Sequence, residues 1–203
     1  MGQFSYYMVG FHPMKAEPQV AVEAHHYCTQ VNSEFAHCTI FDGNSTNANL
    51  VGIEYIVSER IFDSFGEGER EYWHPHNYEI LSGMLVMPGL PAPMEKEMLA
   101  GKMNSYGKTW HTWQSGSLLA PGVPLPLEEA MLAWSYNADG EIAPAMLAER
   151  DRRMGIDTAK ERADRADLVD LAHPQWGVDA LAPSFPNRIP MRGVEDKGAV
   201  SEE

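Results

Sequence analysis

The sequence predicts an α+β fold: a mixed or antiparallel sheet with packed helices, followed by a Pro/Gly-rich C-terminal tail. Segments with the two-residue alternation of half-buried strands are interspersed with segments whose apolar residues recur at helical spacing. These segments lack the regular strand–helix–strand rhythm that indicates a parallel sheet. We expect a single globular domain over residues 1–176 and an irregular, partly disordered tail over residues 177–203.

Three segments carry strand signals. Residues 23–41 alternate loosely, which fits one or two half-buried strands. Residues 50–57 are apolar at every second position, which puts the carboxylate of Glu54 on the opposite face. Residues 108–114 alternate in the same way. A lone carboxylate in such a strand usually faces solvent, and if Glu54 is buried it needs a partner such as a histidine or a metal.

Helix signals lie between and after these strands. Ser58 stands where a helix N-cap would stand. The segment Met94–Tyr106 consists of good helix formers, and Gly107 follows it as a C-terminal glycine does. Helical patterning returns at 143–154, and a Thr-x-x-Glu capping box opens a further helix at Thr158.

Charge and cysteine content exclude several classes of protein. The net charge of −14 over 203 residues repels nucleic acid and anionic lipid headgroups. No apolar run approaches the ~20 residues of a transmembrane helix, and Met1–Lys15 lacks the pattern of a signal peptide. Cys28 and Cys38 are too few for a disulfide framework, so two buried free thiols are expected, with a single disulfide as the alternative. The default location is cytoplasmic.

The clearest chemical signal is the pair His74 and His76. Side chains on an extended chain alternate, so a His-x-His pair points both rings to one side, and Pro75 stiffens that backbone. Neutral imidazole is the commonest metal ligand in proteins. The pair therefore predicts a metal site. The alternatives are loop or strand-edge histidines satisfied by hydrogen bonds, and a metal-free acid/base role.

Other segments would have to complete the set of ligands. Glu79 supplies a carboxylate if the chain bends after His76, and His111 is a further candidate. His25 and His26 are expected on opposite faces of a strand, so at most one of them joins the site, and we assign His26 to the metal. Two histidines with a carboxylate suit non-haem iron, and three histidines suit zinc.

Catalytic and pocket roles fall to neighbouring residues. We assign catalytic roles to Glu54 and His25, and we expect Tyr27, Trp73 and Trp110 to wall a cofactor or ligand pocket. The chain has no Gly-x-Ser-x-Gly nucleophile elbow and no glycine-rich phosphate-binding motif. Nucleophilic and nucleotide-dependent chemistry therefore lack support.

Four segments carry a family resemblance. They are Glu23–Cys28, Leu50–Glu59, Trp73–Gly83 and Tyr106–Gln114. In this order they resemble the oil-body-associated protein family, a domain of unknown function with plant, fungal and bacterial members and no settled activity. The resemblance places all the candidate histidines and glutamates within the family's most recognisable motifs. The chain departs from the family after Gln114, where the usual charged turn is replaced by Ser115-Gly116-Ser117.

Together these observations favour a metal-dependent enzyme, an oxidoreductase, lyase or hydrolase, that acts on a small, fairly apolar molecule through zinc or iron. The first alternative is a non-catalytic protein that binds lipid droplets or a hydrophobic ligand. The second is a haem protein. The expected partner is a small-molecule substrate or an apolar ligand, with a homodimer left open and with neither nucleic acid nor a transmembrane segment.

Overall fold

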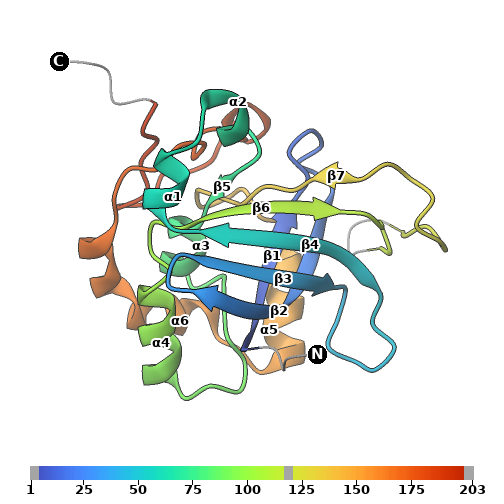
Figure 1. Cartoon of the computed structure of the whole chain (residues 1–203). Helices are drawn as coiled ribbons and strands as arrows, with labels where there is room; N and C mark the ends of the chain where they lie inside the picture. The colour runs from blue at the N-terminus through green and yellow to red at the C-terminus, as the bar shows by residue number, and fades with distance from the viewer. Residues whose placement is uncertain (1–4, 117–120, 199–203) are drawn as a thin grey trace.

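The computed structural model describes residues 5–116 and 121–198 (Figure 1). The strands are β1 (Tyr6–Pro13), β2 (Ala21–Asn32), β3 (Phe35–Phe41), β4 (Leu50–Val57), β5 (His74–Pro75), β6 (Tyr106–His111) and β7 (Met131–Leu132). The α-helices are α1 (Glu59–Asp63), α2 (Glu67–Arg70), α3 (Asn77–Leu81), α4 (Ala92–Ala100), α5 (Pro144–Met154) and α6 (Thr158–Asp164). Two 3₁₀ helices follow, η1 (Ala166–Leu171) and η2 (Ala182–Ser184).

All the strands belong to one antiparallel sheet in the order β1-β2-β3-β4-β6-β5, with β7 also paired to β6. The sheet curls until its two ends meet. Met14, directly after β1, forms a bridge with Ala133, directly after β7. The amide of Trp134 donates to the carbonyl of Pro13 at 2.8 Å. The α+β class and the antiparallel sheet are confirmed, and the curl creates an enclosed inner face.

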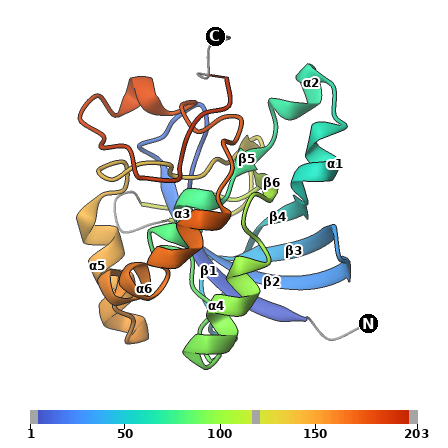
Figure 2. The same cartoon turned by 90° about the vertical axis from the view of Figure 1, so that its left-hand side faces the viewer.

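Helices cover one side of this sheet. Figure 2 shows α3, α5 and α6 gathered beside the strands. The largest apolar core lies between them and includes Phe11 on β1, Ile80 on α3, Met146 on α5 and Leu168 on η1. Burying such side chains stabilises the fold by about 1.5–3 kcal/mol each. Within the described residues, no helix has the length and apolar character needed to cross a membrane.

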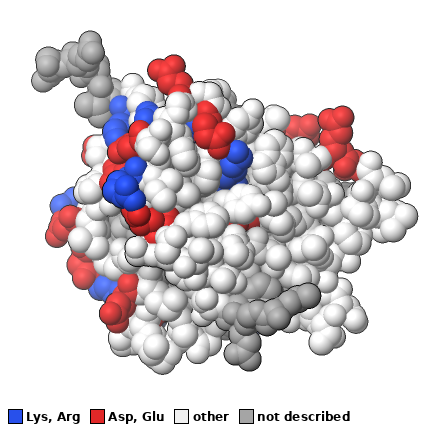
Figure 3. Space-filling model, in the orientation of Figure 1, with Lys and Arg blue, Asp and Glu red and all other residues white. Residues whose placement is uncertain are grey.

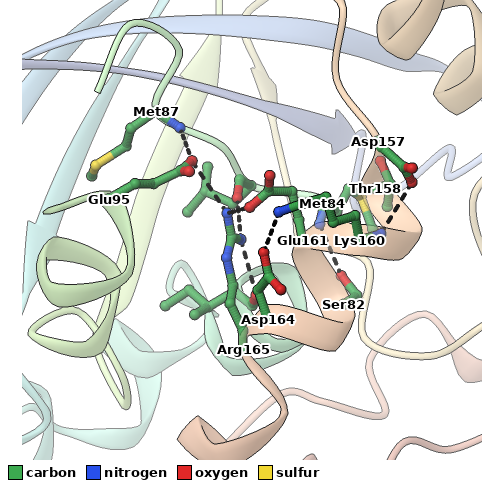
Figure 4. Close-up of polar contacts among 12 residues, drawn as sticks. Ser82, Met84, Met87, Glu95, Asp157, Thr158, Lys160, Glu161, Asp164 and Arg165 are labelled. Atoms are coloured by element: carbon green, nitrogen blue, oxygen red, sulfur yellow. Dashed lines mark hydrogen bonds and ion pairs between the residues drawn. The ribbon is translucent and has the colours of Figure 1, made fainter. Parts of the chain in front are cut away.

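A buried arginine ties the helices to the segment that follows α3 (Figure 4). Arg165 is 1% exposed, and its Nη1 donates to the carbonyls of Ile80 and Leu85 at 3.2 and 2.6 Å. Its Nη2 lies 3.2 Å from a carboxylate oxygen of Glu95 on α4 and 3.1 Å from one of Glu161 on α6. Arg165 therefore satisfies one carbonyl of α3 and one of the buried loop after it, and it joins α3, α4 and α6 to this loop.

Glu54 on β4 faces the interior of the protein, and not the solvent as the sequence suggested. Glu54 is 2% exposed, whereas Ile53 and Tyr55 are 39% and 40% exposed. The two-residue alternation is as predicted, but Gly52 and Ile56 share the inner face with Glu54. Burying a carboxylate is unfavourable unless it is paired, and imidazoles on other strands provide the partners.

The helix predicted over 94–106 is shorter in the structure. The helix α4 ends at Ala100, with Gly101 as its C-cap. The chain then turns through Asn104, whose φ of 64° lies in the left-handed region that asparagine tolerates. Gly107 lies within β6 and does not cap the helix.

Cys28 and Cys38 form a disulfide, so the expectation of two free thiols was wrong. They stand directly opposite each other on β2 and β3, with their Cα atoms 4.0 Å apart. Their register follows from the pairing of the two strands, which the spacing of two cysteines in the sequence does not reveal.

The described part of the predicted tail, residues 177–198, packs against the rest of the chain. Val178, Leu181 and Val194 are buried. The backbone of Ile189 pairs with that of Asp139 through hydrogen bonds of 2.8 and 3.0 Å. Residues 199–203, on which part of the predicted disorder falls, lie outside the described residues.

Candidate functional site

Five histidines and one glutamate converge on the inner face of the curled sheet. They are His12 on β1, His26 on β2, Glu54 on β4, His74 on β5, His76 directly after β5, and His111 on β6. We call these six residues the histidine cluster. None of them is more than 6% exposed. Ionisable groups are rarely buried this completely without partners or a bound metal.

Glu54 lies at the centre of the histidine cluster. Its Oε2 is 3.2 Å from Nε2 of His26, and its Oε1 is 3.3 and 3.5 Å from Nε2 of His74 and His76. Two groups of potential ligands share this carboxylate, one with His12 and His26 and one with His74 and His76. Ligand atoms about 2.05 Å from a tetrahedral zinc ion are about 3.4 Å apart. The spacing in the cluster is therefore close to that of metal ligands.

His12 links two further histidines. Its Nδ1 is 3.0 Å from Nε2 of His111, and its Nε2 is 3.3 Å from Nε2 of His26. A neutral imidazole has one N–H donor and one acceptor, so these contacts satisfy only part of the ring nitrogens. Nδ1 of His26, Nδ1 of His74 and Nδ1 of His111 have no hydrogen-bond partner among the described residues, and Nε2 of His74 has only the Glu54 oxygen at 3.3 Å. Such buried, unpartnered nitrogens fit a group that accepts their lone pairs, such as a metal ion.

A hydrogen bond to Ser105 fixes the orientation of the His76 ring. Its Nδ1 lies 2.8 Å from Oγ of Ser105, and this hydroxyl donates its proton to the carbonyl of Lys102 at 2.7 Å. The hydroxyl can therefore only accept from the ring, which places the imidazole proton on Nδ1. The lone pair of Nε2 then points toward Glu54. In metal-binding histidines, a hydrogen bond to the other ring nitrogen commonly orients the ring in this way.

The pKa values of the cluster favour neutral imidazoles and an ionised carboxylate. Burial alone raises the pKa of Glu54, but hydrogen bonds from the imidazoles of His26 and His74 outweigh it and hold that pKa well below its usual range. Burial lowers the pKa of His74 to about 4 and that of His111 to about 3. These are the protonation states in which the side chains bind metals.

The room beside the cluster is small. A methyl group on Gly107 would lie 2.7 Å from Nε2 of His74 and would also overlap the carboxylate of Glu54. The cavity bounded by the cluster has a volume of about 10 Å³. One water molecule or one ion needs about that much space. The cavity does not accommodate a haem, so the haem alternative lacks a site here.

Glu79, predicted as a ligand, is 3% exposed and lines the same cavity, outside the two groups that share Glu54. Burial, together with the negative charge of Glu54, raises the pKa of Glu79 well above its usual range. A carboxylic acid that keeps its proton can donate a hydrogen bond to a molecule in the cavity, whereas a metal ligand must lose the proton.

Four other predicted site residues lie away from the cavity. His25 faces the outer side of β2, where its ring nitrogens contact Tyr7 and Glu23 at 2.5 and 2.8 Å. Tyr27 directly follows the inward-facing His26, and Trp110 directly precedes the inward-facing His111. Because side chains alternate along a strand, both aromatic rings face outward. Trp73 packs in a separate apolar cluster, and its indole donates to Glu69.

His12 is the cluster member that the sequence interpretation missed. It follows Tyr6, Met8 and Gly10 at two-residue spacing on the inner face of β1. That alternation was available in the sequence. The residue lacks a neighbouring histidine and stands in an apolar stretch, so it carries no local motif.

Comparison with known proteins assigns the family. A family model described as "Protein of unknown function (DUF1264)" matches residues 1–169. The chain is 35% identical to oil body-associated protein 1B of Arabidopsis thaliana, over 90% of this chain and 73% of the relative. It is 33% identical to oil body-associated protein 1A of Zea mays, over 90% of this chain and 74% of that relative. It is 38% identical to oil body-associated protein 2B of Arabidopsis thaliana, over 80% of this chain and 65% of that relative.

No solved structure matches the chain. The names of the relatives refer to oil bodies, and this finding overturns the plain cytoplasmic location expected from charge and cysteine content. The family resemblance drawn from the four sequence segments is confirmed. The family model covers most of the sequence, and the relatives exceed 30% identity over most of their own length. The chain belongs to the DUF1264 family, whose members include the oil body-associated proteins.

Proposed function

We propose that this protein associates with the surface of lipid droplets without catalysing a reaction there. The observation that carries the proposal is the name shared by its relatives, which describes association with oil bodies and no reaction. The enzymatic interpretation lacks comparable support, because none of these relatives is named for an activity. The proposal takes up the hydrophobic route to lipid, since the net charge of −14 disfavours an electrostatic one.

The outer face of the sheet supports such a route. Ile53 and Tyr55 of β4 are exposed there, beside Phe35 and His37 of β3 and Trp110 of β6. Figure 3 shows mainly uncharged residues over this face, with the charged side chains gathered elsewhere in the view. Exposed apolar residues on a face with little charge are typical of contact with lipid or protein. We infer that this face contacts the droplet.

A flotation assay with triacylglycerol droplets coated with phosphatidylcholine tests the proposal. The wild-type protein is expected to rise with the droplets. Ile53→Glu combined with Tyr55→Glu should leave most of the protein in the aqueous layer, because inserting two carboxylates into a lipid surface is costly. The matched control combines Leu171→Glu with Ile189→Glu, two exposed apolar residues outside this face, and should float like the wild type.

Two outcomes would count against this proposal. A wild-type protein that stays in the aqueous layer would remove the lipid-droplet function. A double variant at Ile53 and Tyr55 that floats as well as the wild type would remove the sheet face as the contact. Circular dichroism of each variant establishes that the fold is retained.

We also propose that the histidine cluster binds a divalent transition metal, with zinc or iron as the candidates. The supporting observation is the spacing of 3.2–3.5 Å between the Glu54 oxygens and three imidazole nitrogens. Histidine and carboxylate ligands suit both metals. Bound metal would supply a Lewis acid, while the chain's own residues hold it in place and exclude water.

Metal content of the purified protein tests this second proposal. His12→Ala and His74→Ala should each weaken zinc binding at least about a hundredfold, since even indirect partners of ligands cost 10–100-fold. His37→Ala removes an exposed imidazole from the outer face of β3 and should bind zinc like the wild type. A wild-type protein that takes up no metal from metal-replete medium would end the proposal.

A further inference from the structure

A cleft of about 610 Å³ opens at one end of the curled sheet. It lies where the β2–β3 turn, the end of β4 with the start of α1, and the end of α4 meet, and Figure 1 shows these segments gathered at the same end. Pockets of 300–1,000 Å³ are typical of small-molecule sites. The cleft is therefore large enough for a ligand, unlike the cavity of about 10 Å³ inside the cluster.

The walls of the cleft are partly apolar. The cleft is lined by Phe35 at the start of β3, Val57 at the end of β4, Met98 on α4 and Met103 in the turn after α4. Methionine side chains adapt their shape to an apolar partner. These four residues offer a surface for a hydrocarbon chain.

The cleft also contains a lysine without a carboxylate partner. Lys102 is half-buried, and its ammonium donates to the hydroxyl of Tyr6 at 2.8 Å while lying 4.2 Å from the centre of the Tyr6 ring. Among the described residues, no carboxylate oxygen lies within 4 Å of this ammonium. A cation removed from water is stabilised by an anion, and the cleft is the side from which one can arrive.

Lys102 and Ile56 line both the cleft and the inner cavity, so these two side chains separate them. Ser105, which orients His76, also lines the cleft. An anionic group bound at Lys102 would consequently lie beside the histidine cluster.

Two of the three carboxylates at the edge of the cleft have polar partners of their own. Glu34 is paired with Arg60, and a carboxylate oxygen of Glu59 lies 2.8 Å from Nδ1 of His173. Glu97 has no ion pair within the described part of the chain. The lysine at the inner end thus remains the cation that selects a ligand, with the buried Glu54 behind it and Glu97 at the edge of the cleft as opposing charges.

We propose that this cleft binds a small monocarboxylate with an apolar chain, of the medium-chain fatty acid type. Its carboxylate accepts hydrogen bonds from Lys102 and Tyr6, and its chain lies along Phe35, Met98 and Met103. The proposal depends on the cleft and not on a metal or on droplet binding, so each can fail without the others.

Calorimetric titration with decanoate, with decanol as the uncharged probe, tests this site. The wild type should bind decanoate at least about tenfold more tightly than decanol, because a hydrogen bond to a charged group contributes that much. Lengthening the acid from octanoate to decanoate should increase affinity about three- to fourfold per methylene. Lys102→Met should abolish the preference for decanoate. Lys96→Met, on the helix α4 that precedes Lys102 and paired with Asp167, should not change it.

Glu97→Gln provides a test of the opposite sign, since removing the opposing charge should strengthen decanoate binding and leave decanol binding unchanged. The titrations are repeated after chelation of metal, which should not alter the preference. Equal affinity of wild type for decanoate and decanol would overturn the proposal. So would unchanged decanoate binding by a folded Lys102→Met variant, because its carboxylate would then bind elsewhere.

Discussion

Gly107 on β6 and Glu54 on β4 share the inner face of the sheet, and the missing side chain of the glycine makes room for the carboxylate of the glutamate. A methyl group at Gly107 would also lie 2.7 Å from Nε2 of His74. Gly107 therefore leaves space for the histidine cluster, because the side chains of Glu54 and His74 occupy the volume that a Cβ atom at position 107 would fill.

Gly107→Ala should disrupt the cluster. The methyl group would push Glu54 and His74 apart, and overpacking of a close-packed interior costs about 1–3 kcal/mol. We expect weaker zinc binding and a lower free energy of unfolding, measured by calorimetry and by urea denaturation.

Gly68→Ala is the matched control. Gly68 lies on the exposed helix α2, and a methyl group added to it would meet no atom within 4 Å. Alanine there should leave zinc binding unchanged and stabilise the helix by up to about 1 kcal/mol. Equal behaviour of the two variants would show that Gly107 has no special role.

The sequence predicted part of this cluster through local spacing. His74 and His76 form a pair readable from three consecutive residues, and His26 and His111 stood out beside aromatic neighbours. His12 carries no such motif, because its partners come from strands 14 and 99 residues away. A sheet that curls until β1 approaches β7 brings these strands together, and local periodicity contains no information about that curl.

Local periodicity also could not predict which face of the sheet carries the side chain of Glu54. Alternation correctly separated it from Ile53 and Tyr55, but it does not say which face is inside. Apolar content favoured the wrong face, since the actual inner face carries histidines. The pairing of Cys28 with Cys38 likewise depends on strand register, which local sequence patterns leave open.

Removing the disulfide should destabilise the protein. Cys28 and Cys38 close a loop with a sequence separation of 10 residues, and cross-links of this size contribute about 2–3 kcal/mol. The double variant Cys28→Ala with Cys38→Ala should unfold at a lower urea concentration than the oxidised wild type. Dithiothreitol should shift the wild type in the same direction and leave the variant unchanged. A wild type that is insensitive to dithiothreitol would contradict the structural role of this disulfide.

Arg165→Met should be among the most destabilising single substitutions. The change leaves Glu95 and two backbone carbonyls without their buried partner, and breaking such a pair costs about 3–5 kcal/mol. Arg152→Met removes an exposed ion pair with Glu149 that solvent screens, and it should change the free energy of unfolding far less. Urea denaturation of both variants measures the difference, and similar losses would show that Arg165 does not brace the loop.

Stability of the metal-free protein should fall as the solution is acidified. Burial lowers the pKa of His74 from 6.5 to about 4, so the folded state keeps this imidazole neutral while the unfolded chain gains a proton. The unfolded state therefore binds more protons below pH 6.5. The contribution of His74 is present in full above that pH and is lost as the pH falls toward 4.

At pH 5 the loss from His74 amounts to about 2 kcal/mol, since each pKa unit corresponds to about 1.4 kcal/mol. Urea denaturation at pH 7 and pH 5 with chelator present measures it. His74→Gln removes the titrating ring and should flatten this part of the pH dependence, whereas His37→Gln, on the exposed outer face of β3, should leave it intact. If both variants lose stability on acidification as the wild type does, then His74 is not held neutral by its surroundings, and the protons are taken up by other groups.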